Sequence, residues 1–167
     1  MQPQIELRSL TDDEYADFAE RQVAESARQR VNADEWSTEE APILARAEAA
    51  DLLADRLRDA GHLFLKGVTA DGICVGWLWV GPAPAFIGSG RERTRWLGQI
   101  TVEETVRGRG FGRALLEALH TRLRADGVEE LWLRVYDWNT VAQRLYRSLG
   151  YELMRQFETD AHLRKVL

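Results

Sequence analysis

The chain has 167 residues, of which 45% are hydrophobic and 29% are charged, so it can bury a core and is not a disordered tail. Its formal net charge of −5 argues against a nucleic-acid partner, because nucleic-acid binders present a basic face. Its single cysteine, Cys74, excludes a disulfide within the chain and a zinc site built on cysteines. We expect a single domain over residues 1–167.

The sequence predicts neither a metal site nor a membrane segment. Its three histidines, His62, His120 and His162, are far apart and do not have metal-ligand spacing. The first residues lack the basic and then apolar pattern of a signal peptide, and no apolar stretch approaches the length of a membrane span. We therefore expect a cytoplasmic protein without a metal or a membrane partner.

The first 61 residues are predicted to form one strand and two helices. Residues 5–7 alternate between apolar and polar side chains, as in a short strand. Thr11 and Glu14 have the spacing of a capping box that opens a helix. A second helix is predicted to begin at Pro42 and to end at Gly61. Its apolar face is expected to comprise Ile43, Ala47, Ala50, Leu53 and Leu57.

Three strands are predicted next. Residues 63–69 and 73–80 read as two strands of a hairpin, because Asp71 and Gly72 between them form a strong turn signal. The second strand is apolar on both faces, which suits a central position in a sheet. Residues 96–102 are predicted to form the third strand.

The remaining residues predict two helices and three strands. Phe111–Ala125 has apolar residues at helical spacing, and a strand at 131–135 follows it. Asn139 is predicted to cap a short helix, and residues 151–157 and 162–167 form a closing pair of strands. The order β-α-α-β-β-β-α-β-α-β-β predicts an α/β (α+β layered) fold. We expect a mixed, mostly antiparallel central sheet flanked by helices, with one strand–helix–strand crossover in the second half.

The segment from residue 100 to 113, ITVEETVRGRGFGR, is the most informative for function. A strand is predicted to end near Val102, and a helix is predicted to open at about Gly110. Glycines allow a ligand to approach backbone amides closely, and a helix start offers unpaired N–H groups and the positive end of a dipole. Three arginines add positive charge. These features predict a phosphate or pyrophosphate site at Arg107, Gly108, Arg109, Gly110, Gly112 and Arg113.

Other interpretations of this loop are a glycine-rich turn with solvated arginines or a different nucleotide site. The loop is not a Walker A motif, because the required Gly-Lys-Ser/Thr is absent. It fits a dinucleotide fingerprint poorly, since Arg113 stands where the third glycine is needed. Asp137, after the next strand, keeps that alternative open.

The loop resembles the cofactor loop of GCN5-related N-acetyltransferases (the GNAT family), which has the form Gln/Arg-x-x-Gly-x-Gly/Ala. Here the loop is Arg107-x-x-Gly110-x-Gly112, and residues 100–102 match the apolar-x-Val strand that precedes it in the family. The family's second motif lies on the following helix. In this chain it corresponds to Asn139, Ala142, Leu145, Tyr146, Gly150 and Tyr151.

The resemblance implies an enzyme that uses acetyl-coenzyme A as co-substrate and transfers acetyl to a primary amine by direct attack in a ternary complex. It implies that the Val102 amide polarises the thioester carbonyl, that Asn139 contacts the pantetheine arm, and that Tyr146 protonates the departing sulfur. The cofactor-binding residues it implies are Ile100, Thr101, Val102, Arg107, Gly108, Arg109, Gly110, Phe111, Gly112, Arg113 and Asn139.

The acceptor and the general base stay open at this point. The acceptor is expected to be a small-molecule amine or an amine of a peptide or protein, and a homodimer is common for such domains. Glu103 and Glu104, just past the strand end, are candidates for the base, and Gln99 is a candidate for holding a water. A non-catalytic acyl-coenzyme A sensor or partner-binding module is the first alternative function. A small nucleotide-binding oxidoreductase that uses the glycine loop and Asp137 is the second.

Overall fold

The computed structural model describes residues 3–58, 60–88 and 92–167. The chain forms two compact units. Residues 1–9 and 62–167 form the first, which we call the sheet unit, and residues 10–61 form the second, which we call the helical unit. The expectation of a single domain over residues 1–167 stays a prediction.

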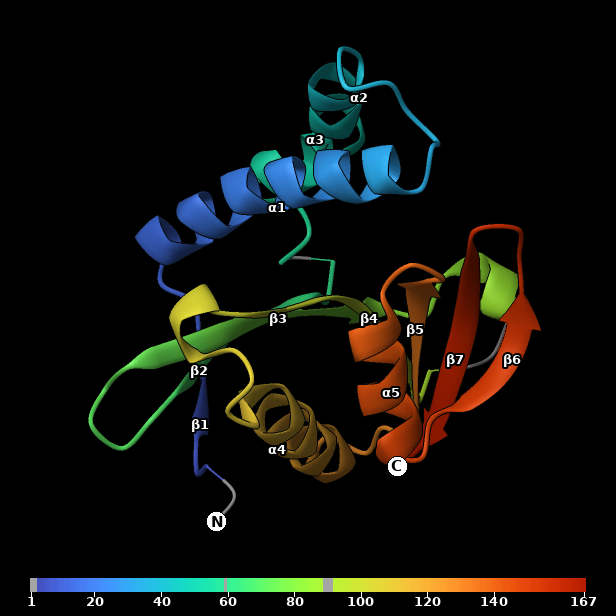
Figure 1. Ribbon diagram of the computed structural model, residues 1–167. Helices are drawn as coiled ribbons and strands as arrows, with labels where there is room; N and C mark the ends of the chain where they lie inside the picture. Colours follow the sequence, from blue (N-terminus) through green and yellow to red (C-terminus); the bar gives the residue numbers. More distant parts are fainter. Residues whose placement is uncertain (1–2, 59, 89–91) are drawn as a thin grey trace. The chain divides into compact units, whose positions relative to one another are not determined.

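The sheet unit is built on a seven-stranded sheet with the order β1-β2-β3-β4-β5-β7-β6 (Figure 1). All neighbouring strands are antiparallel except β4 and β5, which are parallel and are connected through helix α4. The mixed, mostly antiparallel sheet and its single crossover are therefore confirmed. The strands are β1 Glu6–Ser9, β2 Leu63–Val68, β3 Cys74–Pro82, β4 Thr94–Val102, β5 Glu130–Tyr136, β6 Glu152–Gln156 and β7 Asp160–Val166.

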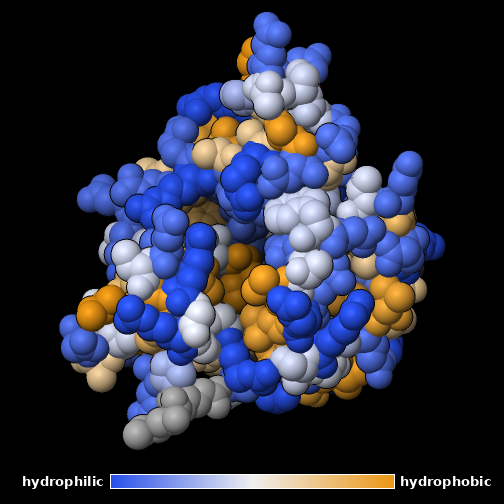
Figure 2. Space-filling view, viewed as in Figure 1, coloured by the Kyte–Doolittle hydropathy of each residue, from blue (hydrophilic) through white to orange (hydrophobic). Residues whose placement is uncertain are grey.

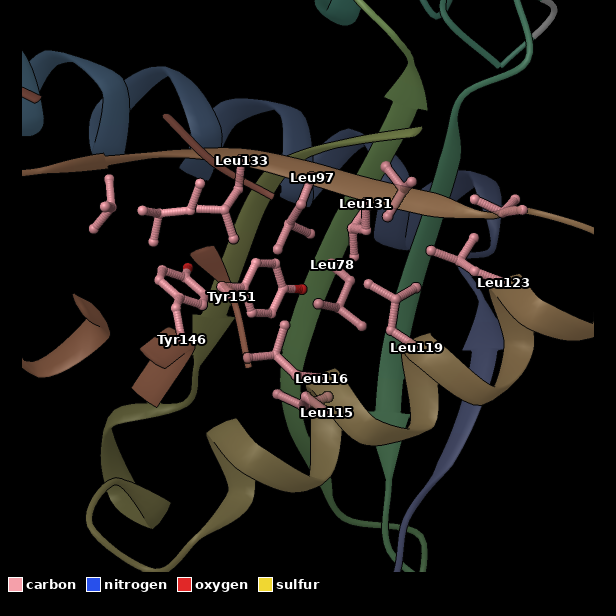
Figure 3. Close-up of a cluster of buried hydrophobic side chains, with 14 of the residues drawn as sticks. Leu78, Leu97, Leu115, Leu116, Leu119, Leu123, Leu131, Leu133, Tyr146 and Tyr151 are labelled. Carbon is pink, nitrogen blue, oxygen red and sulfur yellow. The ribbon is translucent and has the colours of Figure 1, made fainter. Parts of the chain in front are cut away.

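Two α-helices, α4 (Phe111–Ala125) and α5 (Thr140–Ser148), and two short 3-10 helices, η1 (Ala85–Ile87) and η2 (Glu104–Val106), complete the sheet unit. The bounds of α4 agree with the prediction. Its leucines pack against leucines of the strands and form the core shown in Figure 3. Removing such side chains from water contributes about 1.5–3 kcal/mol each. The most deeply buried of them include Leu78, Leu115, Leu116, Leu119 and Leu131.

Alternation along the strands divides the side chains between two faces of the sheet. In β5, Leu131, Leu133 and Val135 are buried in the core with α4, so the residues between them, Trp132 and Arg134, point to the opposite face. We call this opposite face the second face. In β3 it carries Trp77 and Trp79, which pair with Thr101 and Gln99 of β4.

The helical unit consists of α1 (Asp12–Asn32), α2 (Ala41–Glu48) and the short α3 (Ala50–Leu53). The predicted capping box is confirmed: the Thr11 hydroxyl accepts from the Glu14 amide, and the Glu14 carboxylate accepts from the Thr11 amide. Within the unit, the hydroxyl of the buried Tyr15 donates to the Leu52 carbonyl at 2.7 Å.

The prediction for the second helix was wrong in its length and in its apolar face. The structure breaks the predicted helix at Ala49, and α3 ends at Leu53. Ile43 is 73% exposed, and the buried residues of α2 and α3 are Ala41, Ala45 and Leu52. Because the helix is interrupted, a single helical period could not describe its buried face. Small alanines take the packing positions that larger residues were expected to hold.

Among the described residues, no helix combines the length and the apolar character that crossing a bilayer requires. Figure 2 shows that hydrophilic residues cover most of the visible surface, with smaller apolar patches between them.

Candidate active site

The parallel pair β4–β5 separates halfway along β4. The paired residues run from Thr94–Glu130 to Leu97–Leu133 and do not continue beyond them. On its other side, β4 stays paired with β3 as far as Val102. The second half of β4 therefore has an edge that faces away from β3 and is not covered by β5.

The backbone groups of Ile100 and Val102 point to this open edge. The Glu103 amide donates to the Val75 carbonyl at 2.9 Å, so Glu103 faces β3, and alternation directs Val102 the other way. The side chain of Arg107 confirms this direction, because its Nε donates to the Val102 carbonyl at 3.1 Å. By the same alternation the backbone groups of Thr101 face β3. The open edge can pair with an extended ligand that has amide groups.

The glycine loop leads from this edge to the start of α4. Gly110 is the N-cap residue of α4 and has a φ of 85°, in the left-handed region that disfavours other residues. No side chain caps the helix there, so its first N–H groups are available to an anion. Gly112 is needed for close packing, since a Cβ there would lie 3.2 Å from Leu145 of α5.

The three arginines of the loop have different surroundings. Arg107 and Arg109 are exposed, and neither has a carboxylate partner among the residues that the structure describes. Arg113 instead connects two helices: it donates to Glu117 at 3.5 Å and to the Ser148 hydroxyl of α5 at 2.5 Å. The loop thus offers two cations to an anion, while Arg113 ties the start of α4 to the end of α5.

Tyr146 lies on α5 with 5% of its surface exposed, and its ring packs against that of Tyr151 at 5.4 Å (Figure 3). Burial raises the pKa of Tyr146 above the ordinary value of a phenol. The Tyr151 amide also donates to the Tyr146 carbonyl at 3.1 Å. The ring contact and the backbone hydrogen bond hold Tyr146 in place. Its raised pKa keeps the phenol protonated at neutral pH.

His120 is a buried polar residue of this region that sequence reasoning left without a role. It is 3% exposed on α4, and its Nε2 lies 2.9 Å from the Tyr151 hydroxyl. Burial, and then the nearby positive charges of Lys165 and Arg124, lower its pKa to about 4, so it is neutral at pH 7. The signal available in the sequence was a histidine on the otherwise apolar face of α4.

Asn139 is the N-cap residue of α5, as predicted, and its side-chain oxygen accepts from the Ala142 amide at 3.2 Å. Of the other predicted site residues, Phe111 begins α4 and is half-buried, and Gly108 has a φ of 74°. The predicted residues thus occupy three connected positions: the open edge of β4, the loop at the start of α4, and the adjacent α5. The described residues contain no group of three or more His, Cys, Asp and Glu side chains that could hold a metal ion.

The sheet unit thus combines a mixed sheet, a strand–glycine loop–helix crossover and a parallel pair that opens halfway. Residues 22–151 match the model of the acetyltransferase (GNAT) family. This match covers more than half of the chain, so the chain belongs to that family.

Individual relatives agree over nearly the whole chain. The uncharacterized N-acetyltransferase YycN of Bacillus subtilis is 26% identical over 163 residues, which are 98% of this chain and 99% of YycN. The crystal structure of YycN matches with a TM-score of 0.85, and the match covers 93% of this chain and 97% of the YycN chain. The PaiA N-acetyltransferase of Thermoplasma acidophilum, solved in complex with coenzyme A, has the same fold with a TM-score of 0.71 at 20% identity. The match covers 98% of this chain and 99% of the PaiA chain.

A shorter match concerns an enzyme with a named acceptor. The [ribosomal protein bS18]-alanine N-acetyltransferase of Haemophilus ducreyi is 40% identical over 52 residues, which are 31% of this chain and 36% of that enzyme.

Proposed function

We propose that this chain transfers the acetyl group of acetyl-coenzyme A to a primary amine by direct attack in a ternary complex. The observation that carries the proposal is the open edge of β4, which leads directly into a glycine loop and an uncapped helix start. An extended amide chain fits the edge and a pyrophosphate fits the loop, so the two features suit the two parts of coenzyme A.

The residues divide the binding between them. The backbone groups of Ile100 and Val102 pair with the pantetheine arm, and the amides from Arg107 to Arg113 hold the pyrophosphate. Asn139 contacts the arm from α5. The Arg107 side chain, which bonds to the Val102 carbonyl, must share or release that carbonyl when the arm pairs with it. Acetyl-coenzyme A supplies an activated thioester.

The chemical step needs a polarised carbonyl and a proton for the leaving sulfur. The Val102 N–H at the open edge polarises the thioester carbonyl in the manner of an oxyanion donor. The amine nitrogen bonds to the carbonyl carbon as the carbon–sulfur bond breaks. The amine releases one proton to solvent, the Tyr146 hydroxyl gives one to sulfur, and the resulting phenolate takes a proton back from solvent before the next turnover. General acids of this kind accelerate reactions by roughly 10²–10⁴-fold.

The amine acceptor fits the relatives: the matched Haemophilus ducreyi enzyme is named for an alanine of a ribosomal protein. A homodimer and a cytoplasmic location stay predictions. The alternative function, a non-catalytic sensor or partner-binding module, would keep the cofactor site and show no turnover. The oxidoreductase alternative would bind a nicotinamide cofactor in the loop instead.

The test is a calorimetric titration of the protein with acetyl-coenzyme A, and with NAD in parallel. We expect sub-millimolar binding of acetyl-coenzyme A and none of NAD. Gly110→Glu should abolish binding, because it places a carboxylate at the anion site. The matched control is Gly127→Glu after the other end of α4, where the φ of 77° imposes the same backbone strain far from the loop.

Loss of binding in both glycine variants would mean that strain, and not the anion site, was measured. A folded protein that does not bind acetyl-coenzyme A would refute the proposal. Binding without turnover across a broad panel of amines would favour the sensor.

A further inference from the structure

The second face of β4 carries a row of polar side chains beside the open edge. Because Ile100 and Val102 pack with the core, Gln99, Thr101 and Glu103 point to the second face. Gln99 Nε2 donates to the Thr101 hydroxyl at 3.1 Å, and the indole N–H of Trp77 donates to the Glu103 carboxylate at 2.5 Å. These hydrogen bonds hold the three side chains in a polar strip along β4, and the strip ends at the negatively charged carboxylate of Glu103.

The other side of the opening is lined by the second half of β5. Arg134 is the first residue of β5 beyond the last pair with β4, and it is exposed. Its guanidinium lies 4.9 Å from the centroid of the Tyr136 ring, which stacks on Trp138 at 5.8 Å. Among the residues that the structure describes, no carboxylate forms an ion pair with Arg134. The opening therefore lies between two surfaces. One is the polar strip of β4, which carries the Glu103 carboxylate, and the other is an aromatic wall of Tyr136 and Trp138, which carries the Arg134 guanidinium.

The groups nearest to Arg134 on the neighbouring strand β7 do not cancel its charge at the surface. His162 is its cross-strand partner, and burial lowers the pKa of that imidazole below its ordinary value. Asp160 is only 9% exposed. Arg134 is thus an exposed cation on this wall, and Arg155 of β6, which is also exposed, lies beyond His162.

An acceptor must approach from the second face if the proposed function holds. Helix α4 and the glycine loop lie on the core side of β4, so the cofactor would reach the open edge from there. The amine then has to come from the opposite face to attack the thioester at Val102. This places the acceptor between the strip of Gln99, Thr101 and Glu103 and the wall of Arg134.

We propose that the acceptor is a small amine that carries a carboxylate, such as an amino acid, and that Arg134 selects it by binding the carboxylate. This inference rests on the proposed function and names its substrate class. The amine end lies against the polar strip, and the carboxylate pairs with the guanidinium, which is well suited to bidentate contacts. Polyamines place a second cation against Arg134 and are disfavoured.

The test compares matched acceptors with acetyl-coenzyme A as donor. The panel contains L-amino acids, each beside its own carboxamide, and spermidine. We expect amino acids to have kcat/KM about tenfold or more above their amides and above spermidine. Arg134→Glu should reverse this order, and Arg134→Gln should remove the preference, while the Kd for acetyl-coenzyme A stays unchanged in both.

The matched control is Arg8→Glu on β1, because Arg8 is an exposed arginine of the same sheet that lies three strands away from β4. This variant should keep the wild-type order of acceptors. Faster turnover of the amides or of spermidine by the wild-type protein would overturn the assignment of Arg134, and so would an unchanged order in Arg134→Glu. Bound acetyl-coenzyme A without turnover of any amine would refute the transferase function itself, and the acceptor assignment with it.

Discussion

The helical unit and the sheet unit use their arginines in different ways. In the helical unit, Arg28, Arg30, Arg46, Arg56 and Arg58 each form an ion pair with at least one carboxylate of the same unit. In the sheet unit, only some arginines are paired in this way, namely Arg8, Arg93, Arg113, Arg122 and Arg164. Among the described residues, Arg107, Arg109 and Arg134 form no ion pair, and these three border the candidate active site. The three cations at the site that have no ion pair are available to a ligand.

The charge balance of the two units follows the same division. Residues 10–61 contain 14 acidic and six basic side chains, a formal charge of −8. The rest of the chain contains 13 acidic and 16 basic ones, a formal charge of +3. A net charge of −5 for the whole chain therefore conceals a basic unit that is suited to the phosphates of coenzyme A. Overall charge is a poor guide to ligands when a chain has two electrostatically different parts.

The largest effect that we expect is on the free energy of unfolding, and it compares a core leucine of the sheet unit with an exposed isoleucine of the helical unit. Leu119→Ala should lower the free energy of unfolding by about 3 kcal/mol, because Leu119 is completely buried and a cavity would remain. Ile43→Ala, at a site that is 73% exposed, should change it by less than about 0.5 kcal/mol. Urea unfolding measures both. Equal losses would contradict the exposure of Ile43 in α2.

The next prediction compares one buried tyrosine of each unit. Tyr146→Phe should reduce kcat about 100-fold and leave the Kd for acetyl-coenzyme A unchanged, because it removes only the proton donor. Tyr15→Phe removes the bond to the Leu52 carbonyl and should cost about 1 kcal/mol of stability without changing kcat. Steady-state kinetics and unfolding of both variants provide the test. An unchanged kcat in Tyr146→Phe would contradict the role of Tyr146 as proton donor and would mean that its ring serves only in packing.

How far the sequence predicted the structure also differs between the units. In the sheet unit, strong local signals such as the Asp71-Gly72 turn and the leucine spacing of Phe111–Ala125 predicted the elements well. In the helical unit, the capping box of Thr11 was found, but the break at Ala49 was not. The alanines of residues 41–54 favour a helix but do not distinguish one face of it from another. The sequence therefore indicated neither the break at Ala49 nor which face of the helix is buried.

The candidate site shows the same limit. Motifs predicted the glycine loop and placed Asn139 at a helix cap, because these depend on local backbone geometry. The opening between β4 and β5 could not be predicted, since it depends on a strand register between distant segments. Arg134 lies at that opening, and nothing in its neighbours along the chain distinguishes it from other surface arginines.

The third prediction uses pH to separate the units. The pKa of His120 is about 4 in the folded chain and ordinarily 6.5, so between these values the unfolded chain binds a proton that the folded chain does not. Stability is then lost as pH falls through this window, by about 2 kcal/mol between pH 7 and pH 5. His120→Gln should show a correspondingly shallower loss in urea unfolding at the two pH values.

The helical unit contains no histidine, and the pKa values of Glu20 and Asp55 in its ion pairs are lowered by Arg46 and Arg58. These pairs therefore keep their contribution until the pH falls below the ordinary range of carboxyl groups. Hydrogen exchange at pH 5 should show lost protection in α4 before α1. Earlier loss in α1 would contradict the assignment of the acid-sensitive group to His120.

The smallest effect concerns the two helix caps, one in each unit. Thr11→Ala and Asn139→Ala each remove a side-chain acceptor from a helix start, so each should cost about 1 kcal/mol of unfolding free energy. Only Asn139→Ala should also weaken acetyl-coenzyme A binding, because its amide is proposed to contact the pantetheine arm. Calorimetry and urea unfolding of both variants separate the two contributions. If the Kd changed equally in both, the cofactor would be responding to general stability, and Asn139 would serve α5 alone.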